Sequence, residues 1–391
     1  MGLAYGLLGL SALALLWAAL VVAHGLVQAL RGRWLDARRR STTQPRPWRV
    51  VARADHGPFF QLWLHACSGR WRWWPGGARA GQYLTLHLAQ PQGMQSRRYS
   101  LAALPRWRWS HLAWVYELAI KREPLGRVSS CLHEQAHAGT VLWALPPAGH
   151  FTWPAQLQGE QVLVAGGIGI TPMRALTQDW LRRGGPVPLT LIWSVRDMRE
   201  WMDYRAQFEA WAAHHERLRF VPLFTGRHEE WRGERGRLTG ARLLAWSQSG
   251  RPRAVWMCAS APMMDSLRTQ LLDAGLPEAD IHVEAFAAPT NPDRASYTMH
   301  WVGHSQALHF SGQPSLLAAL LEQGVALDHD CRNGSCARCV VRVLEGAVRQ
   351  VLAPEVALPE GCVLSCCVVP SGPLRLAGIA PGPLGRKFGA E

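Results

Sequence analysis

Cysteines near the C-terminal end of the chain have the spacing of a loop that binds an iron–sulfur cluster. Cys331, Cys336 and Cys339 follow a C-x4-C-x2-C pattern, and Cys366 and Cys367 adjoin each other further along the chain. Three thiolates on a loop and a fourth on a distant strand can hold two irons and two sulfides. A structural zinc site is the alternative, although zinc ribbons normally use paired C-x2-C knuckles. The spacing therefore favours a [2Fe–2S] cluster.

A glycine-rich turn in the middle of the chain has the features of a nucleotide-binding site. It lies between a short apolar run and a helix-like stretch, and its characteristic residues are Gly166, Gly167, Gly169, Thr171 and Pro172. Glycines let the backbone approach phosphates, and the N-terminus of the following helix supplies a favourable dipole. The turn therefore predicts binding of NADH or NADPH.

The next apolar run ends at two charged residues that bear on the choice between the two nucleotides. Arg196 follows Leu189–Val195 and is placed to meet the ribose or phosphate of the nucleotide, although a solvated loop arginine is an almost equal alternative. Asp197 would repel a 2′-phosphate. The pair therefore favours NADH over NADPH.

A third group of residues has the chemistry to bind a flavin. Arg97, Tyr99 and Ser100 end a strand-like run. The arginine can neutralise a phosphate, the tyrosine can stack on the isoalloxazine ring, and the hydroxyl can donate a hydrogen bond to its nitrogen edge. Further along, a helix opens at three residues whose N–H groups can receive a pyrophosphate, namely Gly126, Val128 and Ser129.

The elements that must position these residues fall into three predicted domains. Alternating apolar residues between 48 and 153 predict antiparallel strands that form a β-barrel or sandwich. Three strand–turn–helix units between 154 and 290 predict a parallel sheet of the doubly wound type. A plausible linker then precedes a small domain over residues 291–391, which contains the cysteines.

The N-terminal segment has the composition of a membrane anchor. Gly2–Leu30 contains no acidic or basic residue apart from one histidine, and about 20 apolar residues suffice to cross a bilayer. The basic linker at 31–47 follows, and the positive-inside rule then places the C-terminal bulk in the cytoplasm. A cleaved signal peptide and a buried core helix are the alternatives. We expect residues 1–30 to be a single-pass anchor in the inner membrane.

Composition limits the partners. The chain of 391 residues has a formal net charge of +14, and its only lysines are Lys121 and Lys387. Such a balance suits nucleic acid, an anionic membrane surface or an acidic protein. The arginines are scattered through tryptophan-rich segments instead of forming one stripe, so nucleic acid is the least favoured of the three and we expect none.

The segment from Tyr297 onward resembles the plant-type ferredoxins. In that family the last ligand follows a Leu-x-Cys pattern, with a proline four residues later, and Leu364, Cys366 and Pro370 match it. The resemblance implies an α+β domain of the β-grasp type and selects Cys366 over Cys367 as the fourth ligand. Ala337 departs from the glycine that the family usually has.

The preceding elements, in their order, resemble the ferredoxin-NADP reductase superfamily, in particular reductases of the phenylacetate-hydroxylase and phthalate dioxygenase types. The resemblance implies that the flavin residues are Arg97, Tyr99, Ser100, Gly126, Val128 and Ser129. It also places the thiol of Cys258 against the nicotinamide ring, beside Tyr99 and Ser100 as catalytic residues. The residues of these motifs are most similar to those of family members that use FAD, and FMN is the alternative. Ala259 and Ser260 stand where the family has glycine and proline, and the alanine is expected to crowd the nicotinamide.

These resemblances imply a membrane-anchored oxidoreductase in which NAD(P)H reduces the flavin and the flavin reduces the cluster. The expected electron acceptor is an oxygenase, hydroxylase or desaturase, and the anchor favours a membrane-embedded one. A soluble Rieske oxygenase is the alternative acceptor. A membrane redox sensor or carrier without nucleotide turnover is the alternative function, because the Cys-Gly-Pro motif is altered.

Overall fold

The computed structural model describes residues 45–68, 78–90, 93–122, 127–201, 204–227, 230–285, 295–329, 334, 338–352, 354 and 358–379. The expected anchor at 1–30 and most of the basic linker lie outside the described residues. None of the helices that the structure describes is both long enough and apolar enough to span a bilayer.

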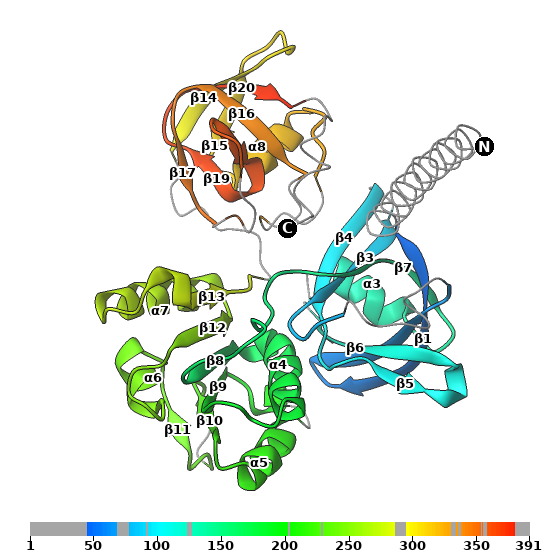
Figure 1. The fold of residues 1–391 in the computed structure, drawn as a ribbon. Helices are drawn as coiled ribbons and strands as arrows, with labels where there is room; N and C mark the ends of the chain where they lie inside the picture. Colours follow the sequence, from blue (N-terminus) through cyan, green and yellow to red (C-terminus); the bar gives the residue numbers. More distant parts are fainter. Residues whose placement is uncertain are drawn as a thin grey trace, which may run out of the picture. The chain divides into compact units, whose positions relative to one another are not determined.

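The first domain is an antiparallel sheet with the strand order β4-β3-β7-β1-β2-β6-β5 (Figure 1). Its strands are β1 (Arg46–His56), β2 (Phe59–Ala66), β3 (Tyr83–Gln90), β4 (Gly93–Ser100), β5 (Arg106–Arg108), β6 (Ala113–Lys121) and β7 (Val141–Ala148). Leu101, directly after β4, forms an antiparallel bridge with Leu118 in β6. The predicted antiparallel sheet is confirmed, and the bridge closes six of its strands into a barrel.

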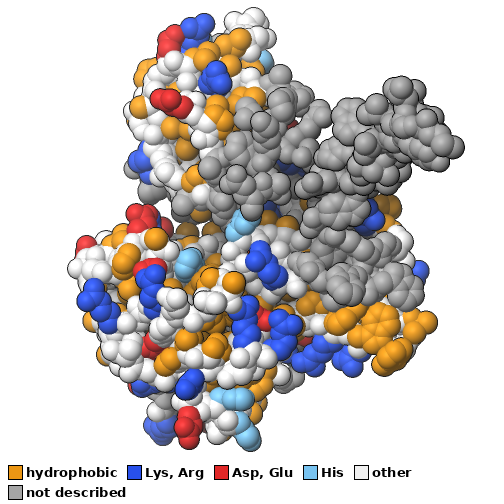
Figure 2. Space-filling view, in the orientation of Figure 1, with side chains coloured by type: hydrophobic (Ala, Val, Ile, Leu, Met, Phe, Trp, Pro, Cys, Tyr) orange, Lys and Arg blue, Asp and Glu red, His pale blue; other side chains and the backbone are white. Residues whose placement is uncertain are grey.

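The barrel is filled by the inward-facing residues of these strands, because successive side chains of a strand point to opposite faces. Trp48 and Tyr116 are fully buried, and their rings meet edge to face with centroids 5.0 Å apart. The helix α3 (Arg127–Gln135) places Val128 and Leu132 in the same core. On the outside, a hydrophobic patch with basic side chains beside it lies over the β5 region (Figure 2).

The second domain is a parallel sheet with the order β11-β10-β9-β8-β12-β13. Its strands are β8 (Gln161–Gly166), β9 (Leu189–Val195), β10 (Leu218–Phe224), β11 (Glu234–Arg235), β12 (Ala254–Cys258) and β13 (Ile281–Val283). The helices are α4 (Ile170–Arg182), α5 (Tyr204–His214), α6 (Gly240–Trp246) and α7 (Ala261–Asp273). The predicted parallel α/β sheet is confirmed.

Helices cover both faces of this sheet, which explains why its central strands are apolar at nearly every position. Leu163 and Ala165 of β8 pack with α4 and α5, whereas Val162 and Val164 pack with α6 and α7. The two helix pairs lie on opposite sides of the sheet (Figure 1). The glycine turn after β8 therefore leads onto the face that α4 and α5 cover.

The C-terminal domain has a mixed sheet with the order β15-β14-β20-β16-β18 and a short second sheet of β17 and β19. Its elements are β14 (Ser296–Trp301), β15 (Leu308–Ser311), α8 (Leu316–Glu322), β16 (Val340–Glu345), β17 (Val348–Gln350), β18 (Cys362–Leu364), β19 (Val368–Pro370) and β20 (Leu374–Gly378). Ser315 caps α8 by accepting a hydrogen bond from the Ala318 N–H at 3.3 Å. Leu316 and Leu320 of this helix pack against the cysteine-bearing segment.

A buried ionic network joins the barrel to the parallel α/β domain. Glu117 of β6 accepts hydrogen bonds from Arg174 at 3.0 Å, from the Tyr204 hydroxyl at 2.8 Å and from Gln61 at 3.1 Å. The Arg174 guanidinium also lies over the Tyr204 ring, 4.3 Å from its centroid, and donates to the Ala102 carbonyl at 2.7 Å. Burial, with the nearby charge of Glu117, raises the pKa of Tyr204 well above its usual value, so the phenol remains a donor.

We expect Arg174→Met to lower the free energy of unfolding by about 3 kcal/mol, because it leaves the buried Glu117 charge without its cation. Only 9% of the Arg174 side chain is exposed. Arg182→Met on the same helix is the matched control, since 70% of that side chain is exposed and its ion pair with Asp179 contributes less than about 1 kcal/mol. Urea unfolding followed by tryptophan fluorescence measures both. Equal losses would contradict a special role for the buried pair.

Candidate functional site

The order in which strands are added to the parallel sheet reverses between β8 and β12. Doubly wound folds bind ligands at such a point. The chain adds β9 and β10 on one side of β8 and then places β12 on the other side. In such sheets the crevice lies outside the carboxyl ends of the two strands. Those ends are Gly166 and Cys258, and the 3-10 turn η2 (Gly167–Gly169) follows the first of them.

Each glycine of this turn is required by local geometry. A Cβ on Gly169 would lie 1.8 Å from the Cys258 carbonyl oxygen, and one on Gly166 would lie 2.7 Å from the Ala259 Cβ. Gly167 has φ +53°, in the left-handed region that favours glycine. The sequence assigned these glycines to the approach of a nucleotide. The structure adds a second reason, which is that the turn must lie directly against the end of β12.

The start of α4 is fixed beside this turn. The Thr171 hydroxyl donates to the Ile168 carbonyl at 3.1 Å, and the Trp193 indole donates to the Gly167 carbonyl at 2.9 Å. Thr171 and Pro172 are buried in the first turn of the helix. The positive dipole end of α4 is therefore presented at the crevice, where it suits a phosphate.

Three side chains from different parts of the chain meet at the same crevice. The Ser100 hydroxyl, at the end of β4, donates to a Glu284 carboxylate oxygen at 3.1 Å, and Glu284 follows β13. Cys258 is fully buried. Burial first, and then the negative charge of Glu284, raises the pKa of the Cys258 thiol well above its ordinary value. The structure thus brings together the predicted Ser100 and Cys258, with Glu284 beside both.

The predicted flavin residues lie on β4 and at the start of α3. Tyr99 and Val128 belong to one apolar cluster, so the strand and the helix meet. Burial raises the pKa of the Tyr99 phenol well above its usual value, against the opposing charge of Arg97. Ser129 is buried, Arg97 is exposed, and Gly126 lies outside the described residues. A guanidinium, a neutral phenol and the start of a helix fit a flavin that carries phosphate.

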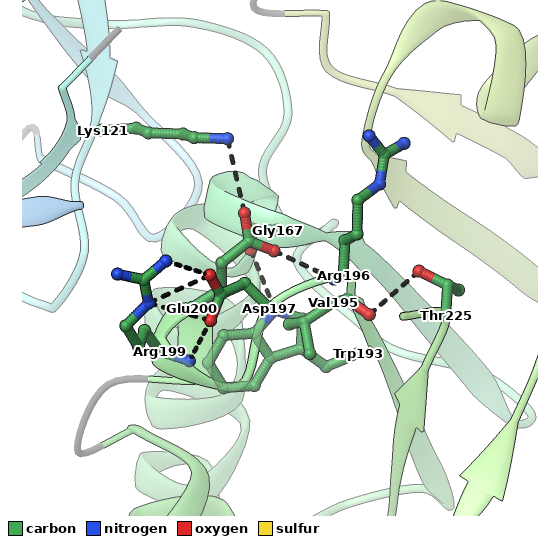
Figure 3. A network of polar contacts seen from close by, with 9 residues as sticks. All are labelled: Lys121, Gly167, Trp193, Val195, Arg196, Asp197, Arg199, Glu200 and Thr225. Atoms are coloured by element: carbon green, nitrogen blue, oxygen red, sulfur yellow. Dashed lines mark hydrogen bonds and ion pairs between the residues drawn. The ribbon is translucent and has the colours of Figure 1, made fainter. Parts of the chain in front are cut away.

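A carboxylate that sequence patterns did not single out lies beside the glycine turn (Figure 3). Glu200, in the 3-10 turn η3 (Met198–Trp201), accepts from the Arg196 N–H at 3.1 Å and from Lys121 at 3.4 Å. One of its oxygens is 3.7 Å from the position of a Cβ built on Gly167. Glu200 belongs to no motif, so only the course of the chain after β9 reveals it.

Asp197, which the sequence favoured as the acidic residue at this edge, is engaged by Arg199. The Arg199 guanidinium and backbone N–H both donate to its carboxylate, at distances from 2.5 to 3.1 Å. These contacts lower the pKa of Asp197, so it remains charged. The side chain of Arg196 points away from this network (Figure 3).

Two predicted cluster ligands, from distant parts of the chain, lie in one buried cluster of the C-terminal domain. Cys339 and Cys366 share an apolar cluster, and both the Ser365 N–H and its hydroxyl donate to the Cys339 carbonyl at 2.9 Å. The Cys366 and Cys367 sulfurs are 3.7 Å apart. Buried thiols held together by backbone contacts fit a thiolate-bound cluster. The other two predicted ligands lie outside the described residues: Cys331 and Cys336.

A flavin barrel, a doubly wound nucleotide domain and a cysteine-bearing ferredoxin-like domain, in this order, define the class of flavin-dependent iron–sulfur reductases. Residues 163–269 match the oxidoreductase NAD-binding domain, and residues 300–371 match the 2Fe-2S iron-sulfur cluster binding domain. Phthalate dioxygenase reductase has the same fold, with a TM-score of 0.53 at 19% identity over 85% of this chain and 98% of that one.

Sequence identity to individual proteins shows the family to which the chain belongs. It is 30% identical over 316 residues to one component of the 1,2-phenylacetyl-CoA epoxidase of Escherichia coli (strain K12), a match that covers 75% of this chain and 86% of the relative. It is also 30% identical to the ferredoxin reductase component of 3-ketosteroid-9-alpha-monooxygenase of Mycolicibacterium smegmatis, over 74% and 84%. The chain belongs to the family of NAD(P)H-dependent flavin and [2Fe–2S] reductase components of oxygenase systems. The prediction of an enzyme with a flavin, a cluster and a nicotinamide nucleotide is confirmed.

The Cys258 thiol gives a prediction about pH. Its pKa in the folded chain lies above its ordinary value of 9.0, so the folded state retains this proton where the unfolded chain loses it. The stability contribution is therefore complete below pH 9.0 and falls as pH rises from there toward the folded pKa, by about 1.4 kcal/mol per pH unit. Compared with Cys258→Ala, the wild-type chain should lose free energy of unfolding more steeply above pH 9.0 in urea titrations. Parallel curves would contradict this.

Proposed function

We propose that this chain is the NADH-dependent, FAD-containing and membrane-anchored form of such a reductase. The observation that carries the proposal is the meeting of Ser100, Cys258 and Glu284 at the carboxyl ends of β8 and β12, with the flavin strand β4 on one side. A nicotinamide held by the glycine turn would reach this point. The family membership favours turnover over a redox sensor without it.

A flavin held by Arg97, Tyr99 and the start of α3 would supply hydride acceptance and one-electron transfer toward a cluster. The residues of the chain position the reactants. Tyr99 offers a ring whose phenol stays neutral, and Glu284 fixes the rotamer of Ser100 by accepting its hydrogen bond. The buried Cys258 thiol excludes water from the end of β12 and adds no charge where the nicotinamide must stack.

The choice of NADH rests on the acidic edge after β9. Asp197 and Glu200 place two carboxylates there, and a 2′-phosphate would have to approach both. Arg199 and Lys121 offset part of that charge. The Arg196 side chain points away from them, so its guanidinium can bind the pyrophosphate or ribose. The choice of FAD over FMN rests on the resemblance of the Gly126–Ser129 region, and release of the flavin by heat followed by chromatography identifies it.

The acceptor is proposed from the relatives and from the N-terminus together. The relatives are named as components of an epoxidase and of monooxygenases. The uncharged Gly2–Leu30 followed by arginines supports a single-pass anchor with the catalytic domains in the cytoplasm. An acceptor in the same inner membrane, such as a hydroxylase or desaturase, would then be reached by lateral diffusion. A soluble Rieske oxygenase remains the second candidate acceptor.

Anaerobic NADH should bleach the flavin and then the cluster absorption of the purified full chain. Cys366→Ser should remove the cluster spectrum while the flavin is still reduced by NADH, because the ligand is lost in a separate domain. Cys367→Ser is the matched control and should retain the cluster, although its sulfur is only 3.7 Å away. Loss of the cluster in the control alone would mean that Cys367, and not Cys366, is the fourth ligand. Failure of NADH to bleach the flavin would contradict the proposed NADH-dependent reductase.

Asp197→Asn should raise kcat/KM for NADPH roughly fivefold and leave that for NADH within about twofold, because a surface charge contributes about 1 kcal/mol. Asp265→Asn on α7, an exposed residue, is the control for a general change of surface charge. Steady-state reduction of ferricyanide measures both nucleotides. An unchanged kcat/KM for NADPH would mean that Asp197 does not face the 2′-position of the nucleotide.

A further inference from the structure

One corner of the barrel exposes large apolar side chains between arginines. Trp109 is 78% exposed and Leu112 is 51% exposed, and Arg106 and Arg108 are exposed on the strand that leads to them. These residues form the end of the β5–β6 hairpin, with the short turn η1 (Trp109–His111) at its apex. We call residues 106–112 the barrel tip, and the hydrophobic patch over β5 in Figure 2 lies here.

The apolar side chains of the tip are held outward by local structure. The Trp107 ring packs edge-on against Trp109 and Trp114, with centroids 5.6 and 6.0 Å apart. Leu112 has φ +44° and donates its N–H to the Trp109 carbonyl at 3.2 Å. A left-handed conformation costs a residue other than glycine about 1 kcal/mol. The turn therefore keeps a leucine exposed in a conformation that folding alone does not favour.

The charges of the tip match an anionic surface. Within the described part of the chain, neither Arg106 nor Arg108 forms an ion pair with a carboxylate. Tryptophan and leucine beside unpaired arginines are the chemistry of the water–lipid boundary, where indole rings sit at the headgroup level and cations meet anionic lipids. Tryptophan and arginine also occur together at protein interfaces, so a protein partner is the outcome that the experiment below must separate from a lipid surface.

The strand register places the tip at the end of the barrel where the N-terminal segment enters. Trp48 of β1 is opposite Ala66 of β2, and Leu64 of β2 is opposite Tyr116 of β6. The first residues of β1, the last of β2 and the first of β6 therefore share one rim. The hairpin end before Ala113 extends from that rim. The chain after β2 continues as residues 69–77, rich in arginine and tryptophan, which lie outside the described residues and are not counted in the surface.

We propose that the barrel tip is a second membrane contact, which inserts Trp109 and Leu112 into the headgroup region of an anionic bilayer while Arg106 and Arg108 bind its phosphates. The inference rests on the proposed anchor, which would tether this rim of the barrel to the bilayer through the linker at 31–47. A short anchor fixes only one point, and a second contact fixes the orientation of the barrel on the surface. Neither contact involves the crevice at β8 and β12.

Hydrogen exchange of the full chain tests this. The chain is reconstituted into vesicles of phosphatidylcholine alone, or of equal parts of phosphatidylcholine and phosphatidylglycerol, and compared with the chain in neutral detergent. Peptides that cover residues 106–114 should gain protection on the anionic vesicles, and peptides of α5 should not. Arg106→Gln with Arg108→Gln should abolish the difference between the two vesicles. Equal exchange of the tip in all three conditions would overturn the proposal.

Trp109→Ser with Leu112→Asn should lose the protection on the anionic vesicles, because asparagine suits the left-handed position but does not insert. Leu272→Ser, an exposed leucine of α7, is the matched control and should keep it. Reduction of ferricyanide by NADH should be unchanged in both, which shows that the chain is folded. Protection that appears without lipid and grows with protein concentration would assign the tip to a protein contact and overturn the proposal.

The two membrane proposals fail in different ways. A chain that floats with vesicles but leaves its tip unprotected retains the anchor and has no second contact. A chain that does not associate with either vesicle contradicts the anchor, and with it the tip. If that chain still reduces ferricyanide with NADH, the proposed reductase activity stands although both membrane proposals fail.

Discussion

The geometry of the crevice depends on a carboxylate withdrawn from water. Glu117 lies on a barrel strand, and only 12% of its side chain is exposed, so its charge must be compensated by neighbours. Arg174 and Tyr204 supply that compensation from the α/β domain, and Gln61 supplies it from the barrel. Because the partners are divided between the domains, satisfying the charge also fixes how the barrel meets the parallel sheet.

The helix α4 connects the buried ion pair to the crevice. α4 begins at Ile170, directly after the glycine turn, and Arg174 follows four residues later, about 6 Å along the helix axis. The end of α4 that faces the crevice and the side chain that binds Glu117 therefore move together. The hydrogen bond from Ser100 to Glu284 at 3.1 Å also joins the two domains. Ser100 and Glu284 are both buried, so the ionic network and this hydrogen bond together fix the junction of the two domains.

Local patterns in the sequence were sufficient to predict the type of the first two sheets. Alternation predicted the antiparallel sheet, and apolar runs followed by glycines predicted the parallel one, because each pattern reflects burial on one face or two. The contacts that join elements left no such pattern. Gln61 and Tyr204 are 143 residues apart, and Ser100 and Glu284 are 184 apart, so neither pair has a spacing that a sequence could display.

The acidic edge shows a second limit of sequence reasoning. Asp197 adjoins the end of β9 and was the obvious carboxylate to meet the nucleotide, yet Arg199 engages it from two residues away. The turn η3 instead carries Glu200 back toward Gly167. Which carboxylate faces the glycine turn is decided by the path of the five residues after β9, and a motif fixes residue types without fixing that path.

The alanine at position 259 can be understood from the same close packing. The resemblance to the family suggested that its methyl group would crowd the nicotinamide. In the structure that methyl lies over Gly166, where a built Cβ would be only 2.7 Å away, and the Ala259 N–H donates toward the Met264 sulfur at 3.3 Å. Gly166 therefore provides the space that the methyl occupies. The departure at position 259 makes the glycine at position 166 more necessary, so the two positions should be considered as one packing unit.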